Sequence, residues 1–312
     1  MSLLNNTNPQ SLIEVIKFFD DIINRYEYSN IDDLISDNFV PDLALPKFSS
    51  GDQPIDKAVL WWFEKNFWII DGGKVVPNNE YGNGSFRKRM MNYLLTKADE
   101  RKFFSDRHEG SVIRVLTSVM RIQGHTYLSA VEASRDKIQL ELNNTGLPLD
   151  ANSEQIPEPY RAERPLKLGV NDSEIASAIR WGNLLGVMTP FSDGYLVDPL
   201  PLFNDYCQDI YEALGSPSRP IPARAFVDKV ADILPIFQGG KYANLLFEVS
   251  RSREYSASNQ LDESFSATIR RAQGAGLIRL TATRADDANA LYLYQDTFGN
   301  PYPISYVEFL NV

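Results

Sequence analysis

The residue types that could perform catalysis are sparse in this chain. It contains two histidines, His108 and His125, and a single cysteine, Cys207. Carboxylates could in principle hold Mg²⁺, and adjacent aspartates occur at 20–21, 32–33 and 286–287. Adjacent carboxylates on helix faces and hairpin tips more often face solvent. The sequence contains no Walker-type phosphate loop, no dinucleotide-binding glycine motif, no nucleophile elbow and no H-E-x-x-H zinc helix. We therefore predict no catalytic residue, no metal site and no cofactor.

Charge is distributed unevenly along the 312 residues. Lysine and arginine total 31 against 41 acidic residues, so the net charge is −10. Residues 1–80 carry a net charge of −7 and residues 151–312 a net charge of −6, whereas residues 81–150 carry +3. An acidic protein can bind nucleic acid only through a local basic patch, because its overall field repels phosphate.

Two clusters of basic residues are candidates for phosphate contacts, since lysine and arginine at helical spacing can neutralise a nucleic-acid backbone. The first cluster lies in the central block and the second near the C-terminus. The predicted nucleic-acid-binding residues are Arg87, Lys88, Arg89, Lys97, Arg101, Lys102, Arg270, Arg271, Arg279 and Arg284. Two other interpretations remain open. These side chains could form a solvated surface, or the central ones could pack against an acidic neighbour in the same chain.

The elements that would position these residues follow a recurring order. Apolar residues at helical spacing predict helices near the N-terminus, at 31–35 and over 54–66. Two short apolar segments joined by Asp-Gly-Gly then predict a β-hairpin over 67–77. Three helices followed by a hairpin outline a winged helix, a relative of the helix-turn-helix.

The same order returns twice further along the chain. A helix over 172–185 precedes a hairpin with Asp-Gly at its tip, and helices over 223–237, 242–250 and 262–273 precede a hairpin formed by 277–280 and 290–294. Aligning Trp68, Gly186 and Gly276 brings the three copies into register. We expect a mainly α fold with small β-hairpins, an α+β class built of tandem winged-helix-like domains. Unrelated α+β segments are the alternative.

The remaining segments define the domain organisation. Residues 81–142 are predicted to be a basic helical block, with 127–131 continuing a helix, and 143–165 to be an exposed linker rich in proline, asparagine and glutamate. The predicted domains are a winged-helix-like domain at 1–80, the block, the linker, a second winged-helix-like domain at 166–215 and a third at 216–312.

The densest aromatic segment includes Trp61, Trp62 and Phe63. Adjacent side chains on a helix point about 100° apart, so one buried face cannot accommodate them all. Either the helix is surrounded by the core, or one side binds a partner protein. We name these three residues as candidate partner-binding residues. The alternating segment 302–310 could close a sheet or offer an edge to a partner.

The chain shows no signal peptide, and no apolar run approaches the roughly 18 residues of a membrane-spanning helix. One cysteine excludes a disulfide framework and fits a reducing compartment. These features predict a cytoplasmic protein that makes no membrane contact.

The N-terminal residues Met1-Ser2-Leu3-Leu4-Asn5, followed by a helix and repeated helix–hairpin units, resemble the DpdG family of accessory proteins from bacterial 7-deazaguanine DNA-modification clusters. The resemblance implies a non-enzymatic component of a DNA-modification or anti-phage system that works with ATPase or nuclease partners. It supplies no catalytic residues. The acidic charge of this chain departs from that of a simple DNA-binding protein.

The leading hypothesis is a multi-winged-helix adaptor or DNA-binding component of a bacterial DNA-modification or defence complex. It would bind other subunits through its first unit, and DNA, where it binds any, through the basic block and the third unit. One alternative is a Mg²⁺-dependent nuclease or another phosphoryl-processing enzyme that uses scattered carboxylates. Another is a transcriptional regulator that reads a specific operator.

Overall fold

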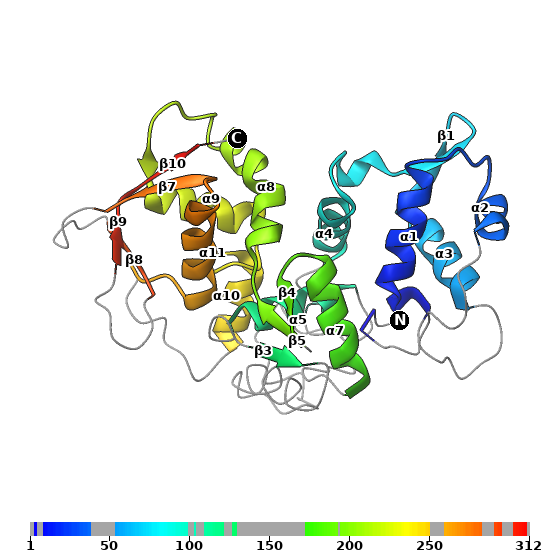
Figure 1. Cartoon of the computed structure of the whole chain (residues 1–312), viewed down its shortest axis with the longest axis horizontal. Coiled ribbons are helices and arrows are strands. Elements are labelled where there is room, and N and C mark those ends of the chain that lie inside the picture. The colour runs from blue at the N-terminus through cyan, green and yellow to red at the C-terminus, as the bar shows by residue number, and fades with distance from the viewer. Residues whose placement is uncertain are drawn as a thin grey trace.

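The computed structural model describes residues 3–4, 9–38, 54–98, 103, 109–121, 127–129, 172–192, 194–249, 259–282, 290–294 and 302–310. Within these residues the chain is mainly helical, with short antiparallel strands in small sheets (Figure 1). The predicted α+β class is therefore confirmed. Among the described helices, none has the length and apolar character needed to cross a membrane.

The N-terminal region has the predicted order of helices followed by a hairpin. Its elements are η1 (Pro9–Ser11), α1 (Ile13–Ile23), α2 (Ile31–Asp37), α3 (Pro54–Glu64), β1 (Trp68–Asp71) and β2 (Lys74–Pro77). The side chain of Asn30 accepts a hydrogen bond of 2.8 Å from the backbone N–H of Asp33, which fixes the start of α2. Strands β1 and β2 pair antiparallel, with Trp68 opposite Pro77.

The central region begins with η3 (Asn79–Tyr81), α4 (Phe86–Lys97) and α5 (Gly110–Arg121). Ser85 caps α4 by accepting a hydrogen bond from the N–H of Lys88. The prediction of a continued helix at 127–131 was wrong at its start, because Tyr127–Ser129 forms strand β3. This short segment pairs with a strand much later in the chain, and a local helical pattern contains no information about that partner.

Beyond the predicted linker, which lies outside the described residues, α7 (Asp172–Leu184) precedes β4 (Met188–Phe191) and β5 (Gly194–Val197). Strand β5 lies in the middle of a three-stranded antiparallel sheet, between β3 and β4. A strand from the predicted basic block therefore belongs to the same sheet as the second hairpin.

The C-terminal region starts directly after β5. Its elements are α8 (Leu200–Ala213), β6 (Ile221–Pro222), α9 (Ala223–Ile233), α10 (Lys241–Val249), α11 (Glu263–Gly274), β7 (Ile278–Thr281), β8 (Leu291–Leu293), β9 (Tyr302–Ile304) and β10 (Tyr306–Phe309). The predicted pairing of 277–280 with 290–294 was wrong. Strand β7 pairs with β10, while β8 pairs with β9 in a separate ribbon. The alternating segment at 302–310 thus closes the sheet, one of its two predicted roles.

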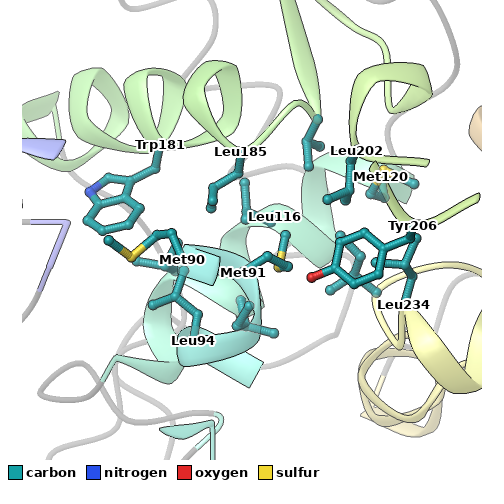
Figure 2. Packing of buried hydrophobic residues seen from close by; sticks show 14 of the residues in the cluster. Met90, Met91, Leu94, Leu116, Met120, Trp181, Leu185, Leu202, Tyr206 and Leu234 are labelled. Carbon is teal, nitrogen blue, oxygen red and sulfur yellow. The ribbon is translucent and has the colours of Figure 1, made fainter. Parts of the chain in front are cut away.

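One hydrophobic cluster joins all these regions, and α4 and α5 lie at its centre (Figure 1). Figure 2 shows Met90, Met91 and Leu94 of α4 between residues of the other helices. Trp181 and Leu185 approach from α7 and the segment that follows it, and Leu116 approaches from α5. Met120 of α5 lies beside Leu202 and Tyr206 of α8, with Leu234 next to Tyr206. The described helices thus share one core.

Candidate functional site

The three helix-to-strand junctions have the same backbone geometry. After α3, α7 and α11, a residue with positive φ ends the helix: Asn66 at 58°, Gly186 at 72° and Gly276 at 73°. The next residue donates its N–H to the carbonyl oxygen five positions earlier, as in Phe67 to Trp62, at 2.8–3.1 Å in all three cases. Such a Schellman turn reverses the chain so that the strand packs against the helices.

This geometry corrects the alignment of the first copy. Asn66, and not Trp68, is equivalent to Gly186 and Gly276, because it has the positive φ and the same pattern of hydrogen bonds. Asparagine is one of the few residues besides glycine that tolerates this conformation. The sequence alignment matched Trp68 with the two glycines, so it placed the first copy two residues out of register.

In each region the second strand of the hairpin has a backbone partner on its other side. Strand β5 pairs with β3 and β10 pairs with β6. In the N-terminal region the N–H of Val75 in β2 donates to the carbonyl oxygen of Tyr28 at 2.8 Å. Along the chain, Tyr28, β3 and β6 each lie between two helices of their own region. The three regions therefore have the same connectivity.

The basic residues at the start of α4 bind acidic residues of neighbouring helices. Arg87 Nη1 lies 3.3 Å from Oδ2 of Asp205, and Lys88 Nζ lies 2.7 Å from Oδ1 of Asp209, both on α8. Arg87 Nε also donates to the carbonyl oxygen of Leu184, the last residue of α7, at 3.2 Å. A cation at a helix C-terminus is stabilised by the helix dipole. The basic start of α4 therefore packs against acidic neighbours in the same chain, one of the interpretations left open above.

Arg89 lies deeper in the protein. Only 4% of the residue is exposed, and its Nη2 donates to Oδ2 of Asp20, on α1, which is 1% exposed. The carboxylate of Asp20 also accepts hydrogen bonds from Nε1 of Trp68 at 3.0 Å and from Nδ2 of Asn24 at 3.1 Å. Burial raises the pKa of Asp20, and the guanidinium of Arg89 opposes that shift. This geometry suits a structural link between α1, β1 and α4.

The other predicted residues of the basic block are only partly described. Nζ of Lys97 lies 5.8 Å from the ring centres of both Tyr81 and Tyr93, a cation–π arrangement. Arg101 and Lys102 lie outside the described residues, as does Arg284 in the C-terminal region.

The remaining predicted cations lie on α11 and β7. Arg270 is exposed at the outer surface of α11. The neighbouring Arg271 is also exposed, but its Nη1 lies 2.6 Å from Oδ1 of the buried Asp198. Nη1 of Arg279, on β7, lies 2.8 Å from Oε2 of Glu308 across the strand pair, with both side chains accessible to solvent. Exposed ion pairs of this kind are weak, so Arg279 can exchange its partner at little cost.

The aromatic residues predicted to bind a partner differ in exposure. Trp62 is fully buried, and its Nε1 donates to the carbonyl oxygen of Gln10 at 3.2 Å. Trp61 and Phe63 are half-buried, and Leu60 next to them is 37% exposed. Trp62 thus belongs to the core, while Leu60, Trp61 and Phe63 give the outer side of α3 an apolar character.

The part of the chain that the structure describes contains no group of three or more His, Cys, Asp or Glu side chains placed to hold a metal ion. Cys207 is buried, which raises the pKa of its thiol to about 11. His108 and His125 lie outside the described residues.

The sequence model of one protein family, described as DpdG-like, matches residues 1–288. The chain belongs to the DpdG-like family. Comparisons with curated proteins and with solved structures find no match. Family membership supports the role in a bacterial DNA-modification cluster that the resemblance implies.

Sequence reasoning missed the acidic partners of α4 in this DpdG-like chain. Asp205 and Asp209 are four residues apart on α8, so they lie on one face of that helix. Arg87 and Lys88 at the start of α4 form the matching basic pair. Two complementary pairs in one chain are the signal that could have identified Asp205 and Asp209 as the acidic partners.

Proposed function

We propose that this chain is a non-enzymatic component of a bacterial DNA-modification system, built of three winged-helix units. The three Schellman turns and the common strand order support the repeated unit. Membership in the DpdG-like family supports the setting.

The strand pairing supports a division into units at 13–77, 110–197 and 200–309. The first unit lies within the predicted domain at 1–80. The second begins at α5, because β3 pairs with β5, and it therefore includes the predicted linker at 143–165. The third begins at α8, because β6 pairs with β10. Helix α4 connects the first unit to the second.

The third unit is the proposed site of nucleic-acid contact. In a winged helix the last helix and the adjacent strands approach nucleic acid together. Arg270 on α11 and Arg279 on β7 are exposed cations on those elements. Arginine binds phosphate oxygens through a planar array of N–H groups, so a few such residues can form a local positive patch on an acidic protein. The exposed position of Arg270 on α11 is the observation on which this contact depends.

The first unit is the proposed site of protein contact. The outer side of α3 carries the exposed residues Lys57, Leu60 and Glu64 beside the half-buried Trp61 and Phe63. On this side of α3 the positive charge of Lys57 balances the negative charge of Glu64, and large apolar side chains lie between the two. Such a surface matches the aromatic and apolar composition of protein interfaces better than a phosphate-binding face.

A salt titration tests the nucleic-acid contact. The full chain is titrated against fluorescent double-stranded and single-stranded DNA at several salt concentrations, alongside Arg270→Ala. The matched control is Arg219→Ala, an exposed arginine of the same unit in the segment between α8 and β6. Loss of one phosphate contact should reduce the slope of log K against log salt by about one. Equal binding by Arg270→Ala and Arg219→Ala would contradict the proposed contact, and cleavage of the DNA with Mg²⁺ would contradict the non-enzymatic assignment.

The protein contact is tested separately by co-purification with the products of neighbouring genes. Leu60→Glu should reduce recovery of the bound subunit, because it places a charge within the apolar surface. Retention of every subunit by Leu60→Glu would exclude this face of α3 as the interface.

A further inference from the structure

The shared junction geometry allows the last helices of the three units to be compared position by position. Counting back from Asn66, Gly186 and Gly276, Leu60 in α3 is equivalent to Arg180 in α7 and to Arg270 in α11. In the same way Lys57 is equivalent to Ser177 and Ala267. These positions define the outer surface of the helix, the one that faces nucleic acid in a winged helix.

The outer surface is exposed at both positions in the first unit and at Arg270 in the third, where Ala267 is half-buried, and it is less accessible in the second. Leu60 and Arg270 are exposed, whereas Arg180 is partly buried, with 24% of its side chain accessible. Lys57 is exposed, whereas the equivalent Ser177 is fully buried. From 174 to 184, where side chains of α7 are described, every residue is buried or half-buried.

The N-terminal region packs against α7 at this surface and beside it. Trp181 is 0% exposed, and its Nε1 donates to the carbonyl oxygen of Leu3 at 3.2 Å. Its ring lies 6.2 Å from that of Trp62 in α3, centre to centre. Nε of Arg180 lies 3.7 Å from Oε1 of Glu14 on α1. Side chains of α7 thus contact residues from three separate segments of the N-terminal region.

We infer that the outer surface of α7 does not contact nucleic acid and instead serves as an internal docking site for the first unit. This inference rests on the proposed winged-helix function. An arginine at position 180 could bind phosphate as readily as Arg270, but Glu14 and the burial of its surroundings direct it to a structural role. Of the two last helices that carry an arginine at this position, α11 is therefore the one available to nucleic acid.

Accessibility of an introduced thiol at the two equivalent positions tests the docking. Arg180→Cys and Arg270→Cys are prepared in the full chain, and each is reacted with a chromogenic disulfide reagent under native conditions. Cys207 is buried and supplies the common background. We expect Arg270→Cys to react at least about tenfold faster, because position 180 requires local opening of the interface. Equal rates in two folded variants would overturn the inference.

DNA binding by the matched alanine variants distinguishes failure of the inference from failure of the proposed function. Arg270→Ala should weaken binding, while Arg180→Ala should leave the affinity within about twofold and lower the melting temperature by a few degrees. If Arg180→Ala weakens binding as much as Arg270→Ala at an unchanged melting temperature, α7 contacts DNA and the inference fails. If neither variant weakens binding while the thiol introduced by Arg180→Cys stays protected, the proposed DNA contact fails and the internal docking stands.

Discussion

Removal of Arg89 should strongly destabilise the N-terminal half of the protein. Asp20 and Arg89 form an ion pair in which both side chains are at least about nineteen-twentieths buried. Arg89→Met keeps much of the side-chain volume but leaves the carboxylate of Asp20 without its cation. Breaking a buried pair from one side costs about 3–5 kcal/mol. The hydrogen bonds from Trp68 and Asn24 to Asp20 remain, so we expect a loss near the lower end of that range.

The loss should depend on pH, with a sign that follows from the pKa of Asp20. Burial raises this pKa above 3.8, and Arg89 opposes the shift, so Arg89→Met raises it further. At pH values between the pKa of Asp20 in the unfolded chain and its higher pKa in the folded protein, the native state binds more protons than the unfolded state. The free energy of unfolding therefore falls as the pH rises through this range. The destabilisation by Arg89→Met should therefore be larger at about pH 7 than at about pH 4.5.

Urea denaturation followed by tryptophan fluorescence measures this effect, since Trp68 lies beside Asp20. The matched control is Lys17→Met, which removes the exposed ion pair with Asp21 on the same helix and should cost less than about 1 kcal/mol. Adding Asp20→Leu to Arg89→Met should recover part of the loss. The remainder is the roughly 1–3 kcal/mol cost of an unpaired indole N–H at Trp68. A loss below about 1 kcal/mol, or one independent of pH, would refute the reasoning.

Three further predictions concern single residues. Gly186→Ala should lower the free energy of unfolding by more than about 1 kcal/mol, because φ is +72° and a Cβ would lie 2.8 Å from the backbone N of Leu202. Asn66→Gly should change it by no more than about 0.5 kcal/mol, because asparagine already tolerates positive φ. Urea denaturation compares the two variants. Trp181→Ala should cost about 3–5 kcal/mol by the same measurement, and a loss below about 1 kcal/mol would mean that its ring is not packed as described. Cys207, with its pKa raised to about 11, should react slowly with a thiol reagent at about pH 8 in the native state and rapidly in urea, so rapid native labelling would contradict its burial.

Local patterns predicted most of the helices and two of the three hairpins. The segment 68–77 pairs across a tight Asp-Gly-Gly turn, so its structure depends on residues that are close together in the sequence. Helix α2 was predicted at 31–35 and extends to Asp37, where Asn38 ends it. Such elements need only spacing, capping and turn residues, all of which the sequence displays.

The errors arose where a distant segment decides the outcome. Two apolar segments follow β7, and the usual shortness of hairpin loops favours the nearer one, at 290–294. The structure pairs β7 with β10 instead, and β8 with β9. Strand β3 was missed for a similar reason, because three residues become a strand only when β5 lies beside them. Neither choice can be made from local spacing.

The charge pattern has more than one interpretation, and the ion pairs at the start of α4 favour packing within the chain. Arg87 and Lys88 both meet α8, whereas Arg89 points into the core, so the three do not form one surface patch. Each meets a different carboxylate, on α8 or α1. The basic excess of the central block and the acidic excess of its flanks thus partly neutralise each other in the folded chain. This explains why a locally positive segment need not indicate a phosphate-binding surface.

Arg180 and Arg270 show the same dependence on neighbouring elements, because residue type and helix position are the same for both. Arg180 is partly buried and lies near Glu14 of α1, while Arg270 is exposed. A sequence comparison of the units would assign them the same role. What distinguishes them is the surface packed against each helix, and for α7 that surface comes from segments more than 100 residues away, including Leu3 and Trp62. For the proposed winged-helix units, the docking of one unit on another therefore determines which of the last helices remain available to a ligand.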